Sequence, residues 1–154
     1  MSAVLEFPQD EYRLMQEDDL ITVVNIEQAA YLFPWSESIF RDCLSAGYAC
    51  WVMELDNELV GYAVLLTAVG ECHILNLCID PVLQGKGYGR RLLNKMLDYA
   101  KSVNANSAFL EVRPSNTYAV ELYESEGFNE VGVRKDYYPA KIGREDAMIF
   151  AKEL

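Results

Sequence analysis

The sequence has no long apolar run and little basic charge. No stretch of about 18 apolar residues occurs, and the first ten residues lack the basic start and apolar core of a secretory signal. We therefore expect a cytoplasmic protein that does not enter a membrane. With 13 basic against 24 acidic residues the formal net charge is -11, which argues against nucleic-acid binding, because that requires a basic patch. The acidity favours a basic macromolecular partner, although acidity also serves simply to keep many proteins in solution.

Histidine is scarce as well, and neither it nor the cysteines indicate a metal site or a nucleophile. The four cysteines, Cys43, Cys50, Cys72 and Cys78, show no C-x-x-C spacing. A zinc site needs closer-set ligands and a cytosolic chain of this size needs no disulfides, so we expect reduced thiols and no bound metal. The single histidine, His73, has no Ser or Cys nucleophile motif beside it, and we interpret it as structural.

Linkers, repeats and low-complexity segments are also missing. At 154 residues and 51% hydrophobic composition, the chain is long enough for one well-packed core and short for two. We therefore expect residues 1–154 to form a single domain.

The hydrophobic pattern predicts alternating strands and helices. Runs rich in Val, Tyr, Leu and Trp predict strands at 12–15, 49–55, 59–69, 72–79, 108–113, 128–138 and 146–152. Helical spacing and end signals predict helices from Asp18 or Asp19 to before Pro34, from Ser36 to Gly47, from about Tyr88 to Val103, and from Pro114 to Gly127. The strands from 49 to 79 read as an antiparallel meander with a hairpin turn at 56–58. This order predicts a mixed α/β sheet with helices on both faces.

Three alternate glycines, Gly85, Gly87 and Gly89, lie between a predicted strand and an amphipathic helix. A bare backbone lets a ligand approach closely, and the free N–H groups of a helix start attract phosphate. A P-loop would need Ser or Thr after Lys86, and a dinucleotide fingerprint would need its third glycine one residue later. The spacing fits Q/R-x-x-G-x-G/A, beginning at Gln84, although a glycine-rich turn without a ligand has the same local pattern.

The residue after the last glycine, Arg90, adds to this pattern. In the first turn of a helix a cation is unfavourable unless an anion lies nearby, so Arg90 favours a phosphate ligand.

In this context the segment resembles the pyrophosphate-binding motif of the GCN5-related N-acetyltransferase (GNAT) superfamily, and the order of elements is similar to that family's fold over nearly the whole chain. The resemblance implies a mostly antiparallel central sheet of about seven strands with four helices on both faces, splayed between strands 4 and 5 to admit the pantetheine of acetyl-coenzyme A. It implies that backbone groups of Leu77, Cys78 and Ile79 contact the pantetheine and acetyl carbonyl. The residues that it implies around the pyrophosphate are Gln84, Gly85, Lys86, Gly87, Tyr88, Gly89 and Arg90.

Two residues are candidates for acid–base chemistry. Acetyl transfer to an amine needs a neutral amine, stabilisation of the oxyanion and a proton for the leaving thiolate. An α-amino group with a pKa of about 7.7 to 8.0 is partly neutral near pH 7, so a carboxylate is a sufficient base. Glu111 alternates with apolar residues in a predicted strand, so it has either a functional use or an ion-pair partner. Tyr123 lies at helical spacing with Ala119, a pattern that also suits a core tyrosine.

The segments LEVRPSN at 110–116 and AVELYESEGF at 119–128 closely resemble the corresponding parts of the bacterial ribosomal-protein-alanine N-acetyltransferases. This resemblance implies that Glu111 is the general base, Tyr123 the general acid and Asn116 a cofactor contact. Asn116 also suits a helix N-cap. The segments FPWS at 33–36 and RKDYYP at 134–139 are similar to the family's pattern around the acceptor, where we expect Trp35 and Tyr138 to contact substrate. Adjacent tyrosines on a strand point to opposite faces, so we expect at most one of the pair 137–138 to line the site.

The resemblance thus implies transfer of acetyl from acetyl-coenzyme A to a basic protein N-terminus, the alanine of a small-subunit ribosomal protein, by direct attack in a ternary complex. A GNAT enzyme acting on a lysine side chain, a polyamine or another small amine remains an alternative. A non-catalytic module that binds coenzyme A or a partner is another, and the presence of both Glu111 and Tyr123 weighs against it.

Overall fold

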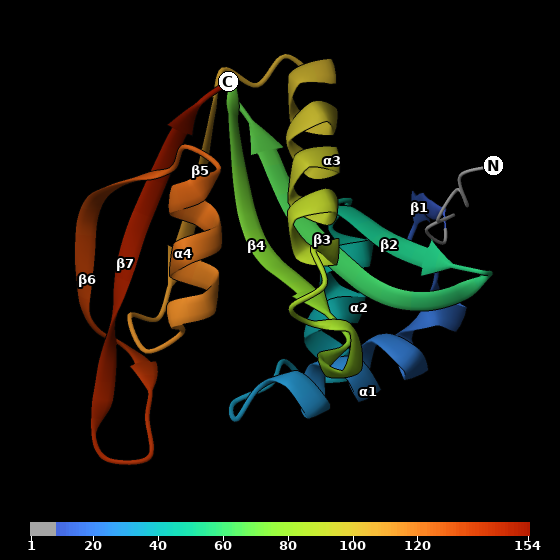
Figure 1. Ribbon diagram of the computed structural model, residues 1–154, viewed down its shortest axis with the longest axis horizontal. Helices are drawn as coiled ribbons and strands as arrows, with labels where there is room; N and C mark the ends of the chain where they lie inside the picture. The colour runs from blue at the N-terminus through green and yellow to red at the C-terminus, as the bar shows by residue number, and fades with distance from the viewer. Residues whose placement is uncertain (1–8) are drawn as a thin grey trace, which may run out of the picture.

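One sheet of seven strands runs through the computed structural model, which describes residues 9–154 (Figure 1). Its strands are β1 (Asp10–Leu14), β2 (Ala49–Leu55), β3 (Glu58–Ala68), β4 (Glu71–Ile79), β5 (Ser107–Val112), β6 (Asn129–Pro139) and β7 (Arg144–Glu153). The helices are α1 (Leu20–Ala30), α2 (Glu37–Ser45), α3 (Tyr88–Ser102) and α4 (Thr117–Ser125), with short 3-10 turns η1 (Glu17–Asp19) and η2 (Pro81–Leu83). The predicted number and order of strands and helices are confirmed.

The sheet has the order β1-β2-β3-β4-β5-β7-β6, and β4 and β5 form its one parallel pair. Their pairing runs from Glu71 opposite Ser107 to Ile74 opposite Leu110. Beyond Ile74 the end of β4 continues to pair with β3 alone, and the two strands diverge toward the lower part of Figure 1. The predicted splay between strands 4 and 5 is therefore confirmed.

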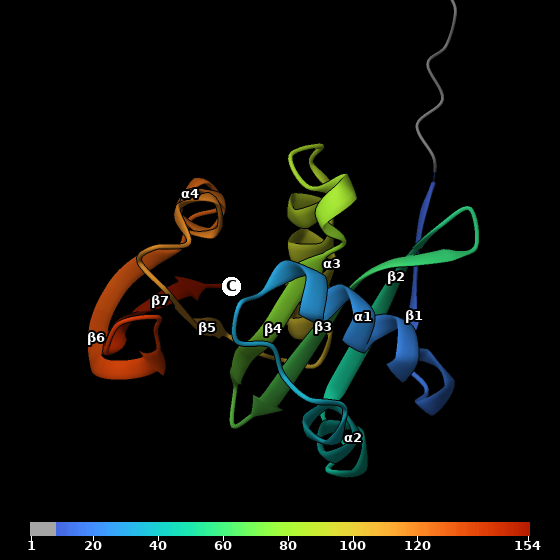
Figure 2. The same cartoon turned by 90° about the horizontal axis from the view of Figure 1, so that it is seen from below.

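Two apolar cores lie on the two faces of the sheet. Helices α1 and α2 cover one face and α3 and α4 cover the other, as Figure 2 shows. Phe40 of α2 packs edge-on against Tyr62 of β3, with ring centroids 5.6 Å apart. On the other face Leu92 and Leu93 of α3 pack with Phe150 of β7. All four cysteines are free and buried, as expected.

Some element boundaries differ from those predicted. The first strand covers Asp10–Leu14 rather than 12–15. The last helix begins at Thr117 rather than at Pro114, because the Asn116 side chain accepts a hydrogen bond from the Ala119 N–H at 3.3 Å and so caps the helix there. The predicted stop at Gly127 is confirmed, since this glycine adopts a left-handed φ of 92°.

Three further expectations concern His73, a membrane span and a signal segment. His73 bonds Glu71 at 2.9 Å and stacks on Phe109, which fits a structural side chain. No helix within the described residues is both long and apolar enough to cross a membrane. The expectation about a signal segment concerns mainly residues 1–8, which lie outside the described residues.

Candidate active site

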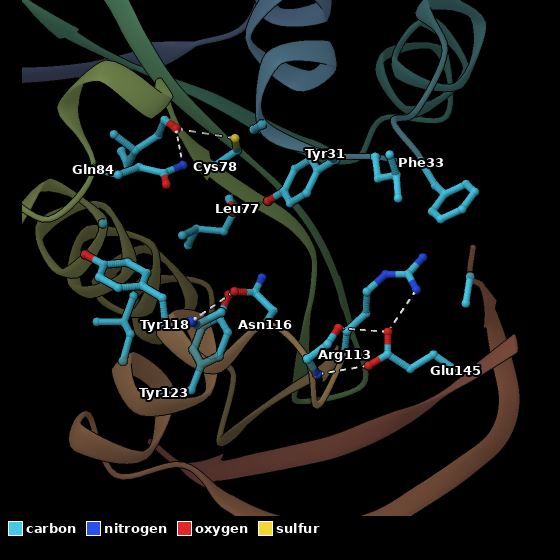
Figure 3. A pocket seen from close by; sticks show the side chains of 18 of the residues that line it. Tyr31, Phe33, Leu77, Cys78, Gln84, Arg113, Asn116, Tyr118, Tyr123 and Glu145 are labelled. Carbon is cyan, nitrogen blue, oxygen red and sulfur yellow. Dashed lines mark hydrogen bonds and ion pairs between the residues drawn. The ribbon is translucent and has the colours of Figure 1, made fainter. Parts of the chain in front are cut away.

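Two adjoining cavities occupy the gap between β4 and β5. The first, of about 480 Å³, is lined by the end of β4, Gln84 and Gly89 of the glycine segment, the α1–α2 loop, α4 and the β6–β7 hairpin. The second, of about 460 Å³, is lined by the α1–α2 loop, β5 and the end of β6. Leu77, Asn116 and Tyr123 line both cavities, and Figure 3 shows Leu77 on β4 facing Asn116 and Tyr123 across the gap. A ligand in the first cavity therefore meets a ligand in the second between these side chains.

The glycine segment is shaped for a close approach of a ligand. Gly85 and Gly87 have φ angles of 79° and 89°, and a Cβ on either would meet no other atom within 4 Å. Gly87 is the N-cap of α3 and supplies no side chain, so the first N–H groups of the helix keep no side-chain partner. Gln84 fixes the start of the segment, since its Nε2 donates to the Ile79 carbonyl at 3.0 Å. The backbone conformation suits an anionic ligand.

The end of β4 is open on the side that faces β5. Leu77, Cys78 and Ile79 pair with β3, and all three line the first cavity. Because a strand turns its N–H and C=O groups alternately to its two edges, this open edge can pair with an amide-bearing ligand such as pantetheine. The residues present therefore fit the pantetheine of coenzyme A.

Other predicted cofactor residues lie farther from the gap. Gly85, Lys86, Gly87, Tyr88 and Arg90 line neither cavity, and only Gln84 and Gly89 of this segment line the first. Arg90 donates to Ser125 Oγ at 2.9 Å and forms an ion pair with Glu126 of α4. A carboxylate thus supplies the nearby anion that this cation requires, and contact between Arg90 and phosphate stays a prediction.

Glu111 is both an ion-pair partner and a cavity residue. Arg134 Nε forms an ion pair with its carboxylate at 2.7 Å, while Glu111 lines the second cavity and its side chain is 27% exposed. A hydrogen bond to Glu111 raises the pKa of the Tyr137 hydroxyl. The ion-pair alternative for Glu111 is therefore confirmed, and its functional use stays a prediction.

Tyr123 is a buried tyrosine whose ring packs against Phe128 at 5.6 Å. Its hydroxyl is protonated at neutral pH, as a proton donor must be, and burial raises its pKa further and makes it a weaker acid. The expected core packing and a place in the cavities coexist in this residue.

Both predicted acceptor residues line the second cavity. Trp35 also packs against Phe40, with ring centroids 5.2 Å apart. Burial raises the pKa of Tyr138 to about 12. Contrary to expectation, Tyr137 lines the same cavity as its neighbour. The strict alternation fails because the β6–β7 register shifts between Arg134 and Tyr138, where Asp136 has a φ of 52°.

Sequence reasoning missed several residues of the site. Tyr31, which ends α1, lines both cavities and donates from its hydroxyl to the Leu77 carbonyl at 3.3 Å. Arg113 places its guanidinium 4.3 Å from the Tyr138 ring and donates to Glu145 at 3.2 Å (Figure 3). The Glu145 carboxylate also accepts from the Ser115 N–H and hydroxyl. These contacts connect β5, the segment before α4 and the β6–β7 hairpin. No local pattern in the sequence predicts them.

Comparison with known protein families shows to which family the chain belongs. The family model described as the acetyltransferase (GNAT) family matches residues 14–128. The chain belongs to this family. GNAT membership confirms the predicted superfamily and implies the use of acetyl-coenzyme A. Among the described residues, no three His, Cys, Asp or Glu side chains gather as a metal site would require.

Several relatives of this GNAT protein carry a more specific description. The "[Ribosomal protein bS18]-alanine N-acetyltransferase" of Escherichia coli strain K12 is 37% identical over 137 residues, covering 89% of this chain and 93% of that protein. The protein of the same name from Haemophilus influenzae is 38% identical over 134 residues, covering 86% and 91%. These matches confirm the resemblance to the ribosomal-protein-alanine N-acetyltransferases.

Solved structures agree. The crystal structure of the ribosomal-protein-S18-alanine N-acetyltransferase from Escherichia coli has a TM-score of 0.88 and 35% identity, covering 94% of each chain. The crystal structure of Ard1 from Thermoplasma volcanium has a TM-score of 0.84 at 21% identity, which shows the shared fold alone.

Proposed function

We propose that this GNAT protein transfers acetyl from acetyl-coenzyme A to the α-amino group of an N-terminal alanine, on a ribosomal protein of the small subunit. The relatives that are 37% and 38% identical bear names with this activity, and their alignments cover most of both chains. The net charge of -11 suits a basic acceptor.

The observation that carries the proposal is the meeting of the two cavities at Leu77 and Tyr123. One cavity leads from there to the glycine segment and the open edge of β4. The other leads to Glu111 and the tyrosines of β6. A cofactor and an amine can thus enter from different sides, as direct attack in a ternary complex requires.

Different residues bind the cofactor, accept the amine proton and donate a proton to the leaving group. The Gln84–Arg90 segment and the free edge of β4 hold the cofactor, and Asn116 contacts it beside Tyr123. Acetyl-coenzyme A supplies the acetyl group as a reactive thioester. Glu111 accepts a proton from the incoming amine, and the buried Tyr123 hydroxyl donates one to the departing thiolate.

The proposal is tested by thiol release from acetyl-coenzyme A in the presence of short peptides that begin with Ala, Ser or Met. Free lysine and spermidine serve as controls for other amines. We expect the highest kcat/KM with the Ala peptide. Faster turnover of lysine or spermidine would move the acceptor to a side chain or polyamine. The absence of thiol release with every acceptor, despite tight binding of the cofactor, would leave only cofactor binding.

A further inference from the structure

Glu27 of α1 is a carboxylate that the proposed reaction does not use. It is 2% exposed, and among residues 9–154 it is the one charged side chain that is buried. None of the ion pairs in the described part of the chain includes it. An isolated buried charge is costly unless hydrogen bonds compensate it, so the groups around Glu27 must supply them.

Three neutral donors surround the carboxylate. Tyr62 of β3 donates its hydroxyl to Oε1 at 2.6 Å, and Asn76 of β4 donates Nδ2 to the same oxygen at 3.0 Å. The backbone N–H of Trp35 donates to Oε2 at 2.9 Å. Glu27 therefore ties the loop between α1 and α2 to the two central strands.

This loop forms one wall of the second cavity. Tyr31, Phe33 and Trp35 all line it, and Glu27 itself borders it. Its other anchors are the hydrogen bond from Tyr31 to the Leu77 carbonyl and the packing of Trp35 on Phe40. Phe33 is 41% exposed, and its ring centroid lies 5.4 Å from the Arg113 guanidinium. Tyr31 and Phe33 also line the first cavity, whereas Trp35 lines the second alone. Loss of the bond to the Trp35 N–H would therefore act mainly on the second cavity.

We propose that Glu27 is a positioning residue for the acceptor. Its hydrogen bond to the Trp35 backbone holds the 31–35 segment in the conformation that receives the incoming N-terminus. The inference rests on the proposed function, because it assigns the second cavity to the acceptor.

Two substitutions separate the hydrogen bonds from the charge. In Glu27→Gln the amide oxygen of the new side chain can accept from the Trp35 N–H. Its NH2 group can donate to the Tyr62 hydroxyl oxygen and, once the Asn76 side-chain amide has rotated, to Asn76 Oδ1. The tether is kept and the charge is lost. In Glu27→Met the side chain has similar length and suits a helix, but it accepts none of the three bonds.

A third variant controls for loosening of the core. Tyr62→Phe removes a donor to Glu27 from the strand side and leaves the bond to the Trp35 N–H in place. Glu27→Met leaves three donors without their acceptor, and Tyr62→Phe removes one of the two hydrogen bonds to Glu27 Oε1, so both should lower Tm. Only Glu27→Met should release the loop.

The variants are compared by steady-state kinetics with an alanine-first peptide, by titration with coenzyme A, and by hydrogen exchange of the Trp35 amide. We expect Glu27→Met to raise KM for the peptide roughly tenfold, to weaken coenzyme A binding by a smaller factor, and to speed exchange at Trp35. Glu27→Gln and Tyr62→Phe should keep the wild-type KM and the slow exchange.

Other outcomes overturn the inference. An equal rise in KM for Glu27→Gln would mean that the charge acts and not the tether, and an equal rise for Tyr62→Phe would mean general loosening. Wild-type protein that acetylates no alanine-first peptide would defeat the proposed function and this inference with it. An active wild type together with an unaltered KM in Glu27→Met would defeat the inference alone.

Discussion

At the scale of single residues, Glu111 is held by Arg134 and yet faces the acceptor cavity. If it accepts the amine proton, Glu111→Gln should lower turnover most at low pH, where few α-amino groups are neutral. With an amine pKa of about 7.7 to 8.0, the loss should reach roughly 10²-fold near pH 6 and shrink above pH 8. The pH profile of kcat/KM for an alanine-first peptide measures this.

Arg134→Met is the matched control, because it removes the same ion pair and keeps the carboxylate. We expect this variant to retain most of its turnover across the pH range. If Arg134→Met and Glu111→Gln lose activity equally at every pH, then Glu111 serves the ion pair and the amine loses its proton elsewhere.

At the scale of elements, the hairpin between β3 and β4 contains an unfavourable residue. Val69 has a φ of 51° and is fully exposed at the turn, followed by Gly70 with a φ of 77°. A β-branched residue in the left-handed region is strained, whereas Asn tolerates that conformation well. Val69→Asn should therefore raise the free energy of unfolding by about 1 kcal/mol and Tm by roughly 2–4 °C.

Val69→Thr separates the backbone effect from the removal of an exposed apolar group. Threonine is polar but keeps the branched Cβ, so thermal unfolding should show little gain. A gain equal to that of Val69→Asn would trace the effect to surface hydrophobicity instead of strain.

The elements also show which parts of the structure the sequence could predict. The hairpin at Asp56 and Asn57, the glycine segment and the stop at Gly127 were predictable, because each depends on a local backbone with positive φ. The bulge that turns Tyr137 toward the cavity could not be predicted, because it depends on a residue of the other strand. The Asp136 N–H donates to the Asp146 carboxylate at 2.8 Å across the hairpin.

The candidate site divides in the same way. Glu111, Asn116 and Tyr123 lie in short segments that carry their own pattern, and the structure brings them together at the gap. Glu27 was invisible in the sequence, because its partners Tyr62 and Asn76 are 35 and 49 residues away. A glutamate on a helix is ordinarily exposed, and only tertiary packing buries this one.

At the scale of the whole molecule, the sheet consists of two parts, β1–β4 and β5–β7, joined by the short parallel pairing of β4 with β5. The residues that we assign to the cofactor come from both parts, with Leu77 and Gln84 in the first and Asn116 in the second. A ligand in the gap would contact both parts of the sheet, on either side of the β4–β5 pairing. Binding should therefore stabilise the fold as a unit.

Thermal unfolding with acetyl-coenzyme A measures this coupling. At about 100 times Kd the ligand contributes about 2.7 kcal/mol by mass action, so Tm should rise by roughly 5–10 °C. Gly87→Ala is the control: a Cβ at Gly87 meets nothing in the protein, but alanine disfavours the φ of 89° that the helix entry needs. This variant should fold with a lower Tm and lose most of the ligand-dependent shift at the same ligand concentration. At a fixed ligand concentration, stabilisation by mass action depends only on Kd. A shift as large as that of the wild type would therefore mean that Gly87→Ala leaves Kd unchanged and that the glycine segment does not hold the cofactor.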